Sequence, residues 1–246
     1  MGSLSGTSAI VVGLVNYGES DRIVKLLTPG EGVVSCMVRG ARKSKKRYGG
    51  ALDIGNVVEV SMKQGRGRLP LLLTVDLSHG HPHLRGDLIR LTLMSYMVEF
   101  VGSLAQEGHE ATKLYGVLQM ALLLLDGVTH PPGVLFRWAL EAKALTFAGL
   151  APQLRRCALC GEELNGELVY VNASGGAAHS SCSRGERLSL DWCLQVEKAR
   201  RTTLADSIDV EPVSGNRWTL HDHLAWHGSR SMKSRVMLAN IEEANP

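Results

Sequence analysis

The hydrophobic pattern of the first eighty residues has the period of β-strands. Apolar and polar residues alternate, fully or in part, in five short segments, which are residues 8–15, 22–28, 32–38, 55–62 and 69–76. Turn-forming residues separate these segments, among them the run Pro29-Gly30-Glu31-Gly32. Five short strands divided by turns indicate a small β-barrel of the OB type over residues 1–80, with a split sandwich as the alternative.

A helical period begins after residue 86. Apolar residues recur at 88, 91, 94, 98 and 101, and Asp87 is placed to cap the start of this helix. Residues 111–125 and 133–148 continue the helical pattern, and two or three further helices are expected over 188–203 and roughly 218–240. The pattern therefore predicts an α+β chain, with a barrel domain at 1–80 and a helical domain at 81–246.

Two ligand pairs with metal-site spacing lie within the predicted helical domain. Cys157 and Cys160 are followed about twenty residues later by His179 and Cys182, and each pair has two residues between its members. This is the spacing of a tetrahedral Cys₃His zinc site. Four protein ligands leave no open position for water or substrate, so the pattern predicts a structural zinc finger inserted at about 155–185.

Alternatives to this ligand set remain open at the level of sequence. The cysteines can also be ordinary buried residues, because a free cysteine behaves as a small hydrophobic side chain. Cys193 lies eleven residues after Cys182 and is the substitute for His179 as the fourth ligand. Its surroundings, Leu190 to Leu194, read as an apolar helix and favour a core thiol.

Composition is that of a globular protein in a reducing compartment. The chain is 44% hydrophobic and 21% charged, and it contains five cysteines. The apolar run from Ala9 to Val15 lacks a preceding basic segment and is too short to span a bilayer. We therefore expect a soluble, cytoplasmic protein without a membrane partner.

Positive charge is concentrated in the predicted barrel. Residues 1–78 contain 11 Lys and Arg against 6 Asp and Glu, whereas the remainder contains 16 against 18. Six of the nine residues from Arg39 to Arg47 are basic, and three more basic residues lie at 63–68. Clustered cations displace counterions from phosphates, so the pattern predicts nucleic-acid contact, although such runs are often only solvated loops. The candidate residues are Arg39, Arg42, Lys43, Lys45, Lys46, Arg47, Lys63, Arg66 and Arg68.

Aromatic residues make up only 5% of the chain. Tyr48, directly after the basic run, is expected to offer one stacking face to a base. The scarcity of other aromatic residues favours binding through phosphate charge, with tolerance for both single and double strands.

Several short segments occur in a characteristic order over most of the chain. They are Tyr17-Gly-Glu-Ser-Asp21, Arg39-Gly-Ala-Arg-Lys43, the Cys-x₂-Cys-Gly segment at 157–161, Gly175-Gly176, Arg200-Arg-Thr-Thr203 and Met232-Lys-Ser-Arg235. Through these segments the chain resembles the bacterial RecO family of DNA repair and recombination mediators.

The resemblance implies a non-enzymatic protein that binds single- and double-stranded DNA and anneals complementary strands, including strands coated with single-strand-binding protein. It also implies a partnership with RecR in recombinase loading, and a place in the bacterial cytoplasm at the nucleoid. Cys157, Cys160 and Cys182 match the family's zinc cysteines, whereas His179 stands where many members have cysteine. No phosphate-binding G-x-x-x-x-G-K-[ST] loop occurs, in keeping with a protein that has no ATPase.

Two other functions compete with this interpretation. One is a zinc-containing OB-fold protein that binds RNA. The other is a zinc-dependent hydrolase of nucleic acid with Glu162 or Glu163 as its base, although thiolate-rich ligation disfavours a reactive metal-bound water.

Overall fold

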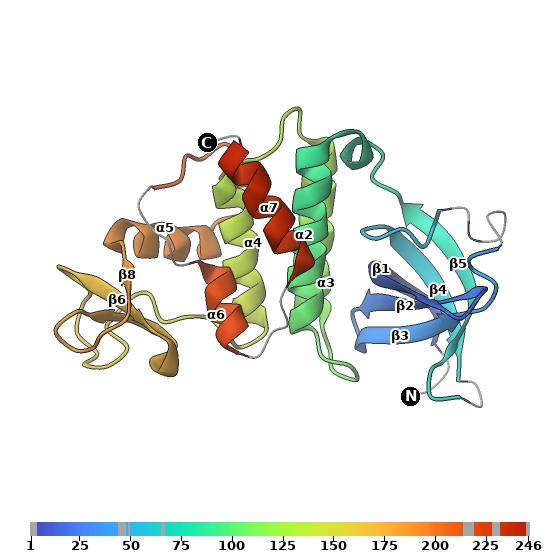
Figure 1. The fold of residues 1–246 in the computed structure, drawn as a ribbon, viewed down its shortest axis with the longest axis horizontal. Helices are drawn as coiled ribbons and strands as arrows, with labels where there is room; N and C mark the ends of the chain where they lie inside the picture. The colour runs from blue at the N-terminus through green and yellow to red at the C-terminus, as the bar shows by residue number, and fades with distance from the viewer. Residues whose placement is uncertain are drawn as a thin grey trace. The chain divides into compact units, whose positions relative to one another are not determined.

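The N-terminal strands close into a five-stranded barrel, as the alternating pattern predicts. A computed structural model describes residues 4–43, 48, 50–64, 67–213, 219–227 and 232–244. The strand order is β1-β2-β3-β5-β4, with antiparallel neighbours except for a parallel β3–β5 contact that completes the closure (Figure 1). The strands are β1 (Leu4–Tyr17), β2 (Asp21–Thr28), β3 (Gly32–Val38), β4 (Val57–Lys63) and β5 (Leu71–His79).

Alternate residues of the strands fill the barrel. In β3 every second residue is buried, from Gly32 through Val34 and Cys36 to Val38. These side chains pack with inward-facing residues of the other strands. Tyr48, Ala51 and Leu52, from the segment between β3 and β4, join the same core. The barrel interior is therefore a packed core and not a channel.

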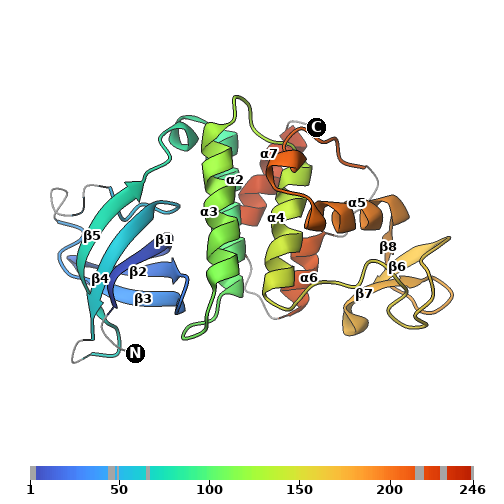
Figure 2. The same ribbon diagram turned by 180° about the vertical axis from the view of Figure 1, so that it is seen from behind.

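Three helices belong to the same compact unit as the barrel, which comprises Met1–Thr129 and Met232–Pro246. Helices α2 (Leu88–Leu104) and α3 (Thr112–Gly127) follow η1 (His83–Gly86), and Asp87 caps α2 by accepting from the backbone N–H of Arg90. Helix α7 (Lys233–Ala244) returns from the end of the chain to lie along α2 (Figure 2). There the backbone N–H and the hydroxyl of Ser234 both donate to Glu99.

The barrel and these helices are in close contact at several places. The hydroxyls of Ser8 in β1 and Tyr115 in α3 are hydrogen bonded at 2.7 Å. Gly32, at the start of β3, has φ +62°, and a Cβ there would lie 2.0 Å from the backbone oxygen of Gln106. Only glycine fits this contact between the β2–β3 turn and the α2–α3 loop.

The second compact unit comprises His130–Ser231. It contains helices α4 (Val134–Phe147), α5 (Leu190–Arg201) and α6 (Leu220–Trp226), the short η2 (Asn172–Ser174) and η3 (Ala205–Ser207), and a three-stranded sheet. The strands of this sheet are β6 (Leu168–Val171), β7 (Gly176–His179) and β8 (Glu186–Leu188), and their order in the sheet is β7-β6-β8. Helices α4 and α5 pack through Trp138 and Trp192, whose ring centroids are 6.0 Å apart.

A buried ion pair lies within α4. Arg137 Nη1 donates to Glu141 Oε1 at 3.0 Å, and both side chains are almost completely buried. The spacing of four residues places the two side chains on one helix face.

Within the described residues, no helix is both long enough and apolar enough to cross a membrane. The predicted domain limits, 1–80 and 81–246, stay a prediction.

Candidate nucleic-acid interface and metal centre

The basic segment after β3 is held by the turn between β1 and β2. Asp21 Oδ1 accepts from the backbone N–H of Gly40 at 2.8 Å and from the hydroxyl of Ser20 at 3.0 Å. Arg42 is held twice, because its backbone N–H donates to Ser20 O at 2.9 Å and its Nη1 donates to Gly18 O at 2.7 Å. Two segments that are separate in sequence, 17–21 and 39–43, therefore form one structure.

The anchoring carboxylate has a lowered pKa. The backbone N–H of Gly40 is the main cause, and the Ser20 hydroxyl adds to the lowering, against a small opposing effect of burial; the charge of Arg39 lowers the pKa further. Asp21 is therefore ionised at neutral pH and accepts both hydrogen bonds. Its charge fixes the start of the basic segment while Arg39 and Lys43 stay exposed.

A second basic segment lies across the β3–β5 contact. Met37 pairs with Leu71, and its backbone N–H donates to Pro70 O at 2.8 Å. This contact brings the β4–β5 loop, which carries Arg68, beside the end of β3, which leads into Arg39. Both arginines line one surface cavity of about 740 Å³. Lys63 is the last residue of β4, where the same loop begins, and its side chain is exposed.

The structure thus brings together five of the nine candidate DNA-binding residues at one end of the barrel, namely Arg39, Arg42, Lys43, Lys63 and Arg68. The other four, Lys45, Lys46, Arg47 and Arg66, lie outside the described residues.

The expectation for Tyr48 was wrong. Its side chain is 8% exposed within the barrel core, and its hydroxyl donates to Arg39 O at 3.1 Å. Tyr48 therefore supports the basic segment from inside and presents no face to a base. Local sequence gave no sign of this, because the apolar partners Ala51 and Leu52 follow a run of charged and glycine residues.

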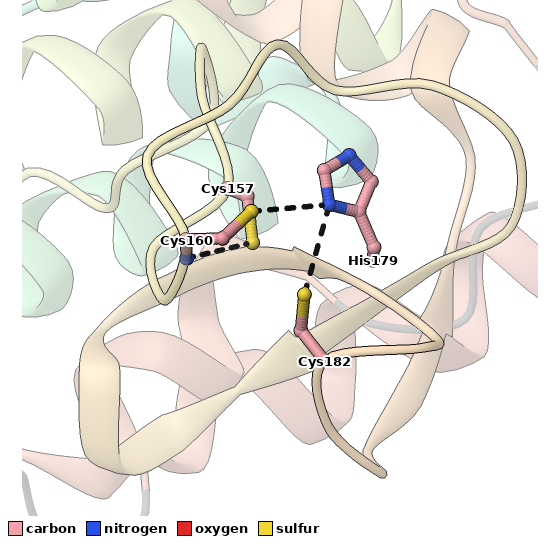
Figure 3. Close-up of side chains that lie close together, drawn as sticks. All are labelled: Cys157, Cys160, His179 and Cys182. Carbon is pink, nitrogen blue, oxygen red and sulfur yellow. Dashed lines mark hydrogen bonds between the residues drawn. The ribbon is translucent and has the colours of Figure 1, made fainter.

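The four predicted metal ligands converge in the second unit (Figure 3). Their ligand atoms all lie within 4.8 Å of one another. His179 Nδ1 is 3.5 Å from Cys160 Sγ and 3.9 Å from Cys182 Sγ. Ligand atoms around a tetrahedral zinc with bonds of about 2.0–2.3 Å are separated by roughly 3.5–4 Å, so the arrangement fits such an ion.

The second ring nitrogen of the histidine is also in place. His179 Nε2 donates to the backbone oxygen of Glu163 at 3.0 Å. A proton on Nε2 leaves the Nδ1 lone pair free for a metal, and metal-binding histidines commonly have such a partner. The donor set of three thiolates and one imidazole is the one that zinc prefers.

Glycines shape both halves of the metal centre. Gly161, with φ +78°, turns the chain back so that its N–H donates to Cys157 O at 3.0 Å. Gly175 also has a positive φ, of +62°, at the turn before β7. Gly176 serves a different purpose, since a Cβ there would lie 2.6 Å from Gln153 O. The Gly175-Gly176 pair thus combines a left-handed turn with a close backbone approach.

The two buried cysteines of the second unit differ in the pKa of their thiols. The pKa of the Cys157 thiol is lowered from 9.0 to about 6: burial opposes the shift, and hydrogen bonds from the backbone N–H groups of Cys160 and Leu159 outweigh it. This favours the thiolate that binds metals. Cys193 is fully buried in α5, outside the converging group, and burial raises its pKa to about 12.

Sequence reasoning missed the sheet and the histidine that support the metal centre. His223 of α6 is buried, shares a hydrogen bond with the Tyr170 hydroxyl on β6, and is 2.7 Å from Leu150 O through Nε2. The pKa of His223 is lowered, chiefly because the side chain is buried. The hydrogen bond to the Leu150 carbonyl opposes this lowering, and the neighbouring His227 adds to it. A neutral imidazole can accept from Tyr170 and donate to Leu150. The short apolar run at 168–171, rich in β-branched and aromatic residues, was the available signal for the strand.

These features define an α+β protein with an OB-type barrel, a basic surface at one end of that barrel, and a Cys₃His group formed by the end of β7 and neighbouring loops. Residues 1–80 match the family described as Recombination protein O N terminal, and residues 85–235 match Recombination protein O C terminal. The chain therefore belongs to the RecO family of DNA repair proteins.

Relatives match over most of this chain. The DNA repair protein RecO of Anaeromyxobacter dehalogenans (strain 2CP-C) is 36% identical over 180 residues, which are 72% of this chain and 70% of that protein. The DNA repair protein RecO of Myxococcus xanthus (strain DK1622) is 31% identical over 240 residues, which are 95% of this chain and 96% of that protein.

Proposed function

We propose that this chain is a DNA-binding mediator that holds single and double strands on the basic end of its barrel and anneals complementary strands without enzymatic turnover. The observation that carries the proposal is the pairing of two basic segments at the β3–β5 contact, with the first segment fixed by Asp21. A basic segment whose backbone is already held can meet phosphates without first losing much loop freedom.

Annealing follows from charge neutralisation. Two strands repel each other through their phosphates, and a shared basic surface lowers this repulsion while raising the local concentration of both strands. Exposed cations such as Arg39, Lys43 and Arg68 suit this role because phosphate contact requires no particular base.

Family membership supports the remaining part of the proposal. We infer that the protein works with RecR and single-strand-binding protein in recombinase loading, in the bacterial cytoplasm at the nucleoid. The name DNA repair protein, carried by its relatives, fits this role.

Annealing of two dye-labelled complementary strands, followed by energy transfer without nucleotide, tests the proposal. Two triple variants make a matched pair with equal loss of charge. The barrel variant is Arg39→Ala, Lys43→Ala, Arg68→Ala; the body variant is Arg155→Ala, Arg184→Ala, Arg187→Ala, at exposed positions of the second unit. The wild type and the body variant should accelerate annealing, and the barrel variant should lose most of the acceleration. No acceleration by the wild type would contradict the proposal.

We also propose that Cys157, Cys160, His179 and Cys182 hold a structural zinc ion. The fit of the donor set and the hydrogen bond from His179 Nε2 support this assignment. The ion would join the segment after α4 to the β6–β8 sheet, and with four protein ligands it would have no open position for catalysis. Metal content measured on protein purified without added metal tests it, with about one zinc per chain expected.

A further inference from the structure

An apolar row crosses the outer surface of the barrel. Val15 pairs with Ile23, Ile23 pairs with Met37, and Met37 pairs with Leu71 across four strands. Directly paired residues of neighbouring strands point to the same face of a sheet. Alternate neighbours of these residues, such as Val24 and Cys36, point into the core, so this row points outward.

Part of this row is exposed, because Ile23, Met37 and Leu71 are half-buried and Val15 is open to solvent. Val15 is 53% exposed, and Tyr17, at the next outward position of β1, is 55% exposed. On β4 the alternate outer residues are polar, with Glu59 and Lys63 both exposed. Outer positions of a barrel in water are ordinarily polar, so the apolar row requires an explanation of its own.

Three members of the row, Ile23, Met37 and Leu71, form the floor of the cavity that Arg39 and Arg68 line. Its volume of about 740 Å³ is within the usual range of roughly 300–1,000 Å³ for ligand pockets, and Tyr17, Ile23, Met37 and Leu71 are among its lining residues. An apolar floor beside two arginines is complementary to a ligand with flat, weakly polar faces and a negative backbone.

The cavity is also electrically asymmetric. Glu107 lines it and precedes Gly108, whose N–H donates to Glu31 O in the β2–β3 turn. Arg39 follows β3 at the opposite end of that strand. Phosphates are therefore attracted to the arginine end and repelled from the Glu107 end.

We propose that this cavity holds unpaired bases of a single DNA strand. Tyr17 stacks on a base, Ile23, Met37 and Leu71 form the floor beneath the bases, and Arg39 and Arg68 hold the adjoining phosphates. The inference rests on the proposed DNA-binding function and adds a preference to it, because bases in a duplex are stacked on one another and have no free face to offer. The arginines then contact the phosphates of both single- and double-stranded DNA, whereas the apolar row contacts the bases of single strands alone.

Substitution of Tyr17 tests the cavity. Tyr17→Ala should weaken binding of a labelled oligothymidine by about 5- to 150-fold at fixed salt, which corresponds to the roughly 1–3 kcal/mol of one base–aromatic stack. Duplex affinity and the salt dependence of both should stay unchanged. Tyr17→Phe is the control, since it keeps the ring and should bind like the wild type. Tyr17 is exposed, so both variants should keep the wild-type melting temperature.

An abasic strand of the same length and charge distinguishes failure of the DNA-binding function from failure of the cavity assignment. If the wild type binds neither oligothymidine nor duplex, the DNA-binding function fails, and the cavity assignment fails with it. If it binds both but binds the abasic strand as tightly as oligothymidine, or if Tyr17→Ala weakens duplex and single strand equally or neither, only the cavity assignment is overturned. Unchanged binding of both forms of DNA by Tyr17→Ala would also be expected if the cavity held an apolar peptide.

Discussion

Replacing His179 with alanine tests both the metal centre and its fourth ligand. His179 Nδ1 lies 3.5 Å and 3.9 Å from two of the thiols, and its loss removes one donor of four. The three remaining thiolates should retain zinc weakly, so dialysis against a chelator should strip the variant and leave the wild type loaded.

The cost in stability follows from the chain that the metal closes. A cross-link between Cys157 and Cys182 encloses about 25 residues, and the chain-entropy relation for cross-links then gives about 3.5 kcal/mol. For a unit of about 100 residues, this loss lowers the melting temperature by roughly 15–25 °C. Calorimetry of the chelator-treated proteins gives their melting temperatures, and zinc content measured on the same samples shows whether the lower melting temperature accompanies the loss of zinc.

Cys193→Ala is the matched control, because Cys193 is the other candidate for the fourth position. Its thiol is buried in α5 and lies outside the converging group. This variant should keep its zinc through the same dialysis and lose only the packing of one sulfur, about 1 kcal/mol. Retention of zinc by His179→Ala together with its loss from Cys193→Ala would refute the ligand assignment.

Three further predictions follow from individual contacts. Arg137→Met should destabilise the protein by about 3–5 kcal/mol in chemical denaturation, because it removes the ion pair that Arg137 makes with the buried Glu141 carboxylate; a loss below about 1 kcal/mol would contradict the buried pair. Gly32→Ala should cost more than about 2 kcal/mol, since φ is +62° and the new Cβ would meet Gln106 O, and a wild-type melting temperature would rule that contact out. The pKa of Asp21 is lowered on folding, so the stabilising effect of its carboxylate is complete above the unfolded pKa of about 3.9 and is lost as pH falls through the lower folded pKa. The NMR resonance of the Gly40 amide, which donates to Asp21, should therefore titrate with a midpoint below about pH 3.9. A midpoint above about pH 4 would contradict the hydrogen bond between Gly40 and an ionised Asp21.

Local patterns predicted the elements whose signals are local. The five strands of the barrel were foreseen because period-two alternation and turn residues act over a few neighbours, and Asp87 was recognised as a helix cap for the same reason. The convergence of the four candidate metal ligands was predicted from spacing alone, because two residues between donors fix a tight turn that aims both at one point.

Features that depend on distant parts of the chain were not visible in the sequence. The return of α7 to α2 joins Ser234 to Glu99, and no local pattern specifies such a contact. The strands β6, β7 and β8 are three or four residues long, too short for a periodic signal. Tyr48 was misinterpreted because its burial depends on the closing of the whole barrel.

The central claim is that cations at one end of the barrel contact DNA phosphates. The most direct measurement is the affinity for a labelled single strand, by fluorescence anisotropy, as a function of salt for the wild type, the barrel variant and the body variant. Each phosphate contact contributes about 0.7 to the slope of log K against log salt, so the barrel variant should lose about 2 from the slope and roughly 100-fold in affinity near 0.1 M salt. The body variant should match the wild type. Equal slopes for all three proteins, or equal losses in both variants, would contradict the account.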